Sequence, residues 1–278
     1  MSKRRDLETQ LRSLTEIKEI MNAMKNLSLM EAHRLTHFLD TQQRVVASIE
    51  AAAADFLSFY TRLVPGDEES RNFYIVLGSE RGFCGDFNES LLQALERHVA
   101  ADGHAKVIAV GNKLAAKLAG DSRFAAFVDG ASVVEEVDPV LVKLMQTLTD
   151  VSGPSAVKLP LRLTVFHHDA LEESVKISAL RPFHKQANVS RFSHAPLLYL
   201  EPQPFLMGLA EQYLFAVLHA LLYSSLMAEN QRRIQHMDAA VQRLERTSGD
   251  LLQKRNILRQ EEITEEIEVI MLSVEALK

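Results

Sequence analysis

The sequence contains little glycine and proline, and both are confined to its middle. Of the 11 glycines and 8 prolines, all except Gly249 lie between Pro65 and Gly208. In a helix interior a glycine costs about 1 kcal/mol and a proline about 3 kcal/mol. Their absence before Pro65 and near absence after Gly208 therefore predict two very long terminal helices. Helices of about 60 and 70 residues would be on the order of 90 to 105 Å long.

Cysteine, basic charge and long apolar runs are also scarce. The single cysteine, Cys84, excludes an intrachain disulfide and a thiolate zinc site and favours a reducing compartment. The net charge of −6 argues against a nucleic-acid-binding domain, which usually presents a strongly basic face. No stretch reaches the ~18 uninterrupted apolar residues of a membrane-spanning helix, and the N-terminus lacks the apolar core of a signal peptide. These features favour a protein made and used in the cytoplasm.

Apolar residues recur with coiled-coil spacing in both terminal segments. A heptad seam in the first segment comprises Leu7, Leu11, Leu14, Met21, Ser28, Ala32 and Leu35, with Ile17, Ile20, Met24 and Leu27 in a second row. In the last segment the seam comprises Met237, Leu244, Leu251 and Leu258, followed by Ile263, Ile267, Ile270, Val274 and Leu277. Because a compact insert separates the two segments, an antiparallel coiled coil is the simplest arrangement. A plain helical bundle is the alternative, but the first segment offers no turn for it.

The middle of the chain alternates between strand and helix patterns. Buried-strand runs are expected at 72–78, 106–111, 160–168 and 174–183, and amphipathic helices at 88–100, 112–120 and 138–151. This alternation predicts an α/β fold with a small, mostly parallel sheet covered by helices. We therefore expect three regions: a long helix at 1–64, a Rossmann-like α/β insert at 65–204 and a second long helix at 205–278.

The stretch GSERGFCGDFN, residues 78–88, is the first candidate for a chemical site. Its glycine spacing fits neither the phosphate loop that ends in Lys-Ser or Lys-Thr nor the dinucleotide fingerprint. A nucleophilic Cys84 would need a base, and no histidine stands in a recognisable hydrolase pattern. The simpler interpretation is a tight turn in which Gly82 and Gly85 let the backbone turn around a small, buried thiol.

Two other polar clusters also lack a catalytic pattern. The sequence His167-His168-Asp169 could suggest a metal ligand set, but neighbouring residues on a strand point to opposite faces. Glu265, Glu266 and Glu268 fall on the polar side of an amphipathic helix, as a solvated face does. The residues therefore predict no catalytic site, no cofactor and no metal.

Four motifs, in order, resemble the gamma subunit of F-type rotary ATP synthases over nearly the whole chain. EIMNAMKNLSLMEAHR resembles the family's N-terminal helix motif, and SERGFCGDFN resembles its Asp-Arg-Gly-Leu-Cys-Gly-Gly-Leu-Asn loop. AENQRRIQHMDAA and NILRQEEITEEI resemble its two C-terminal helix motifs. The matching residues are Ile20, Ala23, Met24, Glu229, Arg233, Met237, Ala240, Asn256, Arg259, Gln260, Ile263, Thr264 and Glu266.

The resemblance implies a rotating shaft without catalytic activity of its own. In that family the terminal helices form an antiparallel, left-handed coiled coil inside a hexamer of alpha and beta subunits. The α/β insert lies at the foot, against the epsilon subunit and the membrane ring of c subunits. Nucleotide is bound in the hexamer, so the resemblance implies that this chain does not bind nucleotide directly. It also implies that the chain belongs to an ATP synthase or ion-transporting ATPase at the cytoplasmic face of a prokaryotic plasma membrane.

The resemblance also assigns roles to individual residues. Arg259 and Gln260 are expected to contact a beta-subunit loop, Met24 to give a soft contact beside it, and the apolar end to lie in a bearing of the hexamer. The expected contacts with beta subunits are Met24, Glu80, Arg81, Cys84, Asp86, Arg259, Gln260 and Thr264. The expected packing residues of the shaft are Ile20, Glu229, Arg233, Met237, Ile263, Ile267 and Ile270.

Several residues depart from the family pattern. Glu31 stands where a basic or small residue is common, Asp86 where a second glycine is, and Ile234 and His236 where methionine and alanine are. These departures suggest a divergent branch, for which the second, sodium-linked (N-type) rotary ATPase is one candidate, although the ion is determined by the membrane ring. The rival functional interpretation is a stand-alone coiled-coil scaffold or adaptor with an α/β insert.

Overall fold

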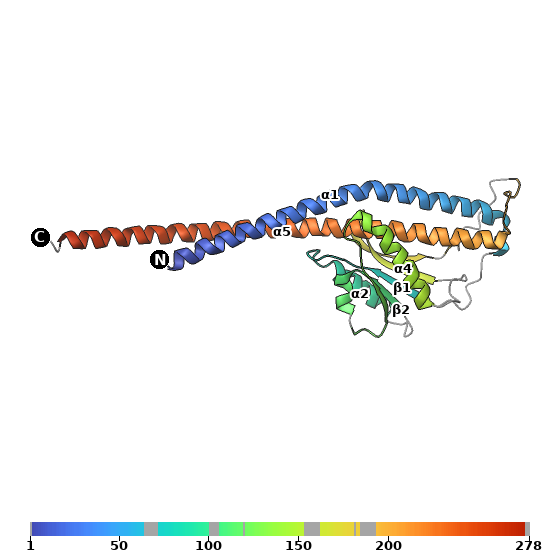
Figure 1. The fold of residues 1–278 in the computed structure, drawn as a ribbon, viewed down its shortest axis with the longest axis horizontal. Coiled ribbons are helices and arrows are strands. Elements are labelled where there is room, and N and C mark those ends of the chain that lie inside the picture. Colours follow the sequence, from blue (N-terminus) through green and yellow to red (C-terminus); the bar gives the residue numbers. More distant parts are fainter. Residues whose placement is uncertain are drawn as a thin grey trace. The chain divides into compact units, whose positions relative to one another are not determined.

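A computed structural model describes residues 2–63, 72–99, 106–118, 120–152, 162–180, 182–183 and 193–275. The chain divides into two compact units, one made of residues 1–28 with 234–278 and the other of residues 29–233. Both predicted terminal helices are present, as α1 (Ser2–Phe59) and α5 (Pro202–Glu275) (Figure 1). Each helix contributes residues to both units. The domain boundaries predicted at 64/65 and 204/205 instead treat each helix as a region of its own, and they stay a prediction.

In the first unit the start of α1 and the end of α5 form the predicted antiparallel coiled coil. Three ion pairs give the direction, because residue numbers rise along α5 as they fall along α1: Lys25–Asp238 at 2.9 Å, Lys18–Glu245 at 2.7 Å and Arg4–Glu262 at 3.4 Å. The less exposed positions keep the heptad spacing that produces a left-handed coil. They include Leu7, Leu11, Leu14, Met21 and Ser28 on α1, and Met237, Val241, Leu244, Leu251 and Leu258 on α5.

The coil departs from the predicted seam at its apolar margins. Met237 is fully buried, as expected for a packing residue. The side chains of Ile20, Ile263, Ile267 and Ile270 are exposed in this chain, so their packing role would need a partner other than α1 and stays a prediction. Ile263 follows Glu262, the last α5 residue ion-paired with α1 in the described structure, and the later isoleucines therefore lie on a helix segment that α1 does not cover.

The second unit contains a five-stranded sheet in the order β3-β2-β1-β4-β5. Its strands are β1 (Asn72–Leu77), β2 (Lys106–Val110), β3 (Phe124–Val128), β4 (Arg162–Asp169) and β5 (Ser174–Leu180). The first four are parallel, and β5 pairs antiparallel with β4. The mostly parallel, Rossmann-like insert is thus confirmed, with the edge strand β3 as an addition that the sequence did not predict.

Helices cover both faces of the sheet. On one face α4 (Val137–Ser152) packs with residues of α1 and α5, including Leu35, Leu218 and Leu222. On the other face α2 (Phe87–Val99) and α3 (Asn112–Leu118) enclose a second core around Val76, Phe87 and Phe166. Short 3₁₀ turns, η1 (Thr61–Leu63) and η2 (Val134–Glu136), complete the described elements, and the carboxyl ends of β1, β2 and β3 meet at one edge.

By length and composition, α5 holds one segment apolar enough to cross a membrane. The sequence predicts no membrane-spanning helix here, because Glu211, Gln212 and His219 interrupt the apolar run. In the second unit, Val217, Leu218, Leu222 and Leu226 of α5 are buried in the core against the sheet. Core packing therefore accounts for the apolar character of this part of the helix.

Candidate functional site: the loop after β1 and its contacts with α5

The loop of residues 78–86 leaves β1 at the carboxyl edge of the sheet. Gly78 is required there, because a Cβ at this position would lie 2.3 Å from Cβ of Leu114 in α3. Gly85 takes a left-handed backbone with φ of 62°, as predicted for a glycine of the turn. The prediction for Gly82 is wrong, since a Cβ there would have only Lys113 Cε within reach, at 3.9 Å, and Phe83 takes the positive φ, 65°.

A carboxylate from α5 holds the backbone of this loop. Glu229 is 3% exposed and accepts hydrogen bonds from the N–H groups of Glu80, at 3.2 Å, and Arg81, at 3.3 Å. Burial raises the pKa of the Glu229 carboxyl, while Arg233 and the two N–H donors favour its charged form. Two consecutive N–H groups that converge on one carboxylate form an anion-binding concavity, and here the chain supplies the anion itself.

Arg233, one turn further along α5, binds the acceptors of the same loop. Its guanidinium donates to the carbonyl oxygen of Gly82 at 3.3 Å and lies 3.4 Å from Sγ of Cys84. It also donates to Asn230 Oδ1 at 2.8 Å and pairs with Glu229. Glu229 and Arg233, predicted to pack within the shaft, lie against the insert, where they connect α5 to the loop.

The thiol of Cys84 lies within this cluster. The residue is 5% exposed, and burial together with the nearby Glu229 carboxylate raises the pKa of the thiol to about 12. A thiol with such a pKa is protonated at neutral pH and a poor nucleophile, which fits the non-catalytic interpretation. The expectation that Cys84 contacts another subunit does not fit this position, because its side chain faces inward.

Glu80 turns its carboxylate toward the ends of two neighbouring strands. It accepts from the backbone N–H of Asn112 at 3.0 Å, just after β2, and from that of Gly130 at 2.7 Å, just after β3. The side-chain amide of Asn112 also donates to it. In open α/β sheets this edge is where phosphate ligands commonly bind. In this chain the N–H groups there are occupied by its own carboxylates, Glu80 and Glu229.

The outward-facing residues of the loop are Arg81, Phe83 and Asp86. Asp86 is exposed and lies 3.9 Å from Arg232, a distance at which the charges interact only weakly. Phe83 is 55% exposed, although it is aromatic and its backbone is in a left-handed conformation. Sequence reasoning missed Phe83, and the available signal was a large apolar residue between the two glycines of a tight turn.

The histidine pair at the end of β4 separates as predicted. His168 stacks on Phe87 of α2, with ring centres 3.9 Å apart, whereas His167 lines a cavity of about 270 Å³ with residues of α1 and α5 on the other face. His167 also contacts Ser178 Oγ at 3.0 Å, and His168 contacts the carbonyl oxygen of Phe87 at 2.9 Å. Burial lowers the pKa of both imidazoles. In the part of the chain that is described, no three potential ligand residues cluster as a metal site would require.

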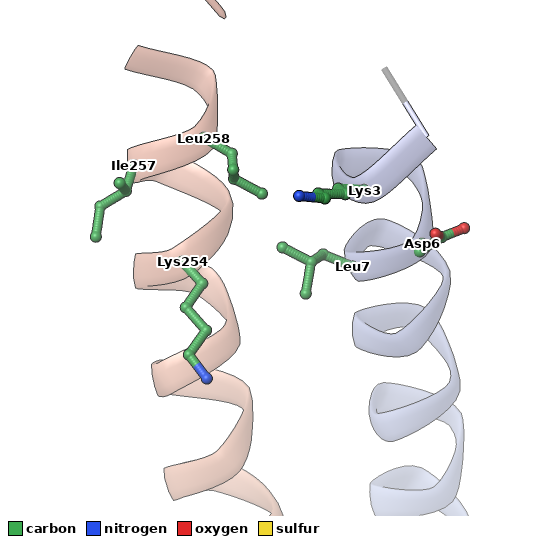
Figure 2. A pocket seen from close by; sticks show the side chains of 6 residues that line it. All are labelled: Lys3, Asp6, Leu7, Lys254, Ile257 and Leu258. Carbon is green, nitrogen blue, oxygen red and sulfur yellow. The ribbon is translucent and has the colours of Figure 1, made fainter. Parts of the chain in front are cut away.

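The remaining candidate contacts lie in the coiled-coil unit. Met24 is half-buried, and Arg259, Gln260 and Thr264 are exposed on α5. Figure 2 shows Leu7 and Leu258 pointing toward one another across a cleft of about 460 Å³, which Lys3, Asp6, Lys254 and Ile257 also line. Arg259 directly follows Leu258, which lines this open cleft. The expected contacts of these residues with other subunits stay predictions.

The family model described as ATP synthase matches residues 3–277 of the chain. The chain belongs to the ATP synthase gamma family. The ATP synthase gamma chain of Clostridium botulinum (strain Langeland / NCTC 10281 / Type F) is 22% identical over 282 residues, covering 97% of this chain and 96% of the relative. That of Wolbachia sp. subsp. Brugia malayi (strain TRS) is 24% identical and covers 91% and 94%.

Solved structures share the gamma fold. A chain of the Euglena gracilis mitochondrial ATP synthase (OSCP/F1/c-ring, rotational state 3) superposes with a TM-score of 0.63 at 15% identity, covering 99% of this chain and 95% of that one. A chain of the Tetrahymena thermophila mitochondrial ATP synthase (central stalk/c-ring) gives 0.62 at 16% identity, covering 80% and 99%. At these identities the likeness supports the fold.

Two of the departures from the gamma pattern have local explanations. Glu31 accepts a hydrogen bond from the N–H of Val134 at 3.3 Å and pairs with Arg34 at 3.3 Å, so it holds the start of η2 against α1. Asp86 is solvent-exposed, where a carboxylate is easily accommodated. Neither explanation indicates which branch of the gamma family the chain represents.

Proposed function

We propose that this chain is the central rotor shaft of an F-type ATP synthase or ATPase, coupling ion flow through a membrane ring to ATP synthesis or hydrolysis in an alpha/beta hexamer. Its family supports this proposal, as do the structural neighbours, which come from a rotor, an F1/c-ring assembly and a central stalk. The proposed partners are the alpha and beta subunits, the epsilon subunit and the ring of c subunits. The chain would lie at the cytoplasmic face of a prokaryotic membrane as a peripheral subunit attached through the complex. The bacterial origin of its relatives from Clostridium botulinum and Wolbachia supports a prokaryotic source.

The observation that carries the proposal is the uncovered end of α5. Beyond Glu262 the helix exposes Ile263, Ile267, Ile270 and Met271, whose spacing of four, three and one residues places them along one face. Single exposed apolar residues are ordinary, but a contiguous set on a helix end marks a surface that another protein covers. A bearing inside the hexamer is such a cover.

The chain's own chemistry supports a non-catalytic role within the complex. The thiol of Cys84 is buried and protonated, and the N–H groups at the edge where a nucleotide phosphate would bind are held by Glu80 and Glu229. The expected contacts of Met24, Arg81, Asp86, Arg259, Gln260 and Thr264 with beta subunits belong to this proposal. In this proposal the partner subunits synthesise or hydrolyse ATP, and this chain rotates within them.

Co-expression with the alpha and beta subunits tests the function. We expect one copy of this chain to copurify with each alpha/beta hexamer, and we expect truncation after Glu262 to weaken that association because the apolar surface is removed. A stable homodimer that does not bind alpha and beta subunits would instead support the scaffold interpretation. An activity of the chain alone that depends on Cys84 would contradict the non-catalytic assignment.

A further inference from the structure

Glu229 and Arg233 form a buried polar pair that neither packing nor catalysis accounts for. The two residues stand one turn apart on α5 and are 3% and 4% exposed. Burying two charges is costly unless their hydrogen-bonding groups are satisfied. In this chain they are satisfied by each other, by Asn230 and by the backbone and the Cys84 thiol of the loop after β1.

The contacts are reciprocal in chemistry. Glu229 supplies acceptors to the N–H groups of Glu80 and Arg81. Arg233 supplies donors to the carbonyl oxygen of Gly82 and to Sγ of Cys84. Consecutive loop residues are thus bound through both their donors and their acceptors, so the position of the loop along α5 is fixed as well as its distance from the helix.

The same loop continues into the sheet through Glu80. Its carboxylate binds the N–H groups that follow β2 and β3, while its own N–H is held by Glu229. A chain of hydrogen bonds therefore runs from α5 through the loop to the carboxyl ends of three parallel strands. The left-handed backbone of Phe83, unfavourable for an aromatic residue, persists within this fixed loop.

Apolar packing alone would not give this directional connection. The core between α5 and the sheet is formed by side chains such as Leu218, Leu222 and Leu226. The hydrophobic effect between such surfaces is non-directional. Ser224 and Ser225 of α5 add one hydrogen bond each, with the N–H of Ala170 and the carbonyl oxygen of Leu77. Hydrogen bonds to backbone groups are directional and oppose sliding or rotation.

We propose that the Glu229–Arg233 pair is the fastening that makes the α/β insert turn together with α5. Both are positioning residues, which act by holding residues 80–84 in place. This inference rests on the rotor function proposed above. It predicts that without the pair torque on α5 is transmitted poorly to the insert, so that ATP hydrolysis and ion transport become uncoupled.

The main test is the double variant E229L/R233L in the complete complex in membrane vesicles. It removes both charges together, which avoids leaving one of them buried without a partner. We expect the complex to assemble and hydrolyse ATP, with a loss of ion transport per ATP hydrolysed. The matched control is Glu211→Gln, an exposed carboxylate on the same helix, for which we expect unchanged coupling. Wild-type coupling in the double variant would overturn the proposal.

A second variant covers the case in which the double variant does not assemble. Glu229→Gln keeps the side-chain shape and one carbonyl acceptor but removes the charge that Arg233 pairs with. We expect reduced coupling and faster hydrogen exchange at the amides of Glu80 and Arg81, and wild-type values of both would refute the fastening. If the wild-type chain does not bind alpha and beta subunits, the rotor function fails. The exchange rates of the two amides then still show whether Glu229 holds the loop.

Discussion

The two glycines at the start of the loop allow a sharp test of the structure, because only one of them is required. In Gly78→Ala the new Cβ would lie 2.3 Å from Cβ and 2.7 Å from Cδ2 of Leu114, well inside contact distance. Either α3 or the loop must move. Forcing extra volume into a packed site costs about 1–3 kcal/mol, which for a unit of this size lowers the unfolding midpoint by roughly 2–12 °C.

Gly82→Ala is the matched control in the same loop. A Cβ there would meet only Lys113 Cε, at 3.9 Å, and the residue does not take a positive φ. Replacing such a glycine is neutral or stabilises by about 0.4–1 kcal/mol, because the unfolded chain loses conformational freedom. Thermal unfolding of the two variant chains, followed by circular dichroism, should therefore shift in different directions or by clearly different amounts. Equal midpoints would refute the described close approach of the loop to α3.

Three further predictions concern side chains. Arg259→Ala should reduce ATP-driven ion transport relative to ATP hydrolysis, since a charge-assisted hydrogen bond contributes about 1.5–3 kcal/mol, and unchanged transport in vesicles would exclude the proposed beta contact. Cys84→Ser should leave the ATPase activity of the complex within about a few-fold of normal. In the wild-type chain, maleimide should label Cys84 only after unfolding, because its pKa of about 12 keeps the thiol protonated. Rapid labelling of the folded chain would contradict the burial of this thiol. Because the pKa values of His167 and His168 are lowered in the folded chain, the unfolded chain binds more protons than the folded chain below about pH 6.5. The free energy of unfolding should therefore fall as pH drops through that value, and less so in His168→Gln. A free energy of unfolding that does not change between about pH 5 and 7 would count against this prediction.

The long helices and their pairing were predictable because they depend on local properties of the sequence. Few glycines and prolines interrupt residues 1–64 and 209–278, and a seven-residue apolar repeat requires a partner helix. The strands at the centre of the sheet were equally evident, since parallel strands buried on both faces are continuous apolar runs. The edge strand β3 was missed because its pattern, Phe-Ala-Ala-Phe-Val, is short and only partly buried.

The contacts of the candidate site could not be predicted from local patterns. Glu229 meets Glu80 across 149 residues of sequence, and an acid followed four residues later by arginine on a helix normally indicates a surface ion pair. The partner of Ile263, Ile267 and Ile270, which are exposed in this chain, is hidden for a similar reason. An apolar repeat shows that a helix has a partner, but it does not show whether that partner is α1 or another subunit.

The carboxylate of Glu80 has a consequence for how the chain behaves in a nucleotide-rich surrounding. Because it is tethered to the same chain as the N–H groups of Asn112 and Gly130, it is present at their site at an effective concentration that a free ligand rarely matches. A phosphate from solution would have to displace it and would bring negative charge close to it. We therefore expect this edge of the sheet to bind nucleotide phosphates poorly as long as Glu80 stays in place.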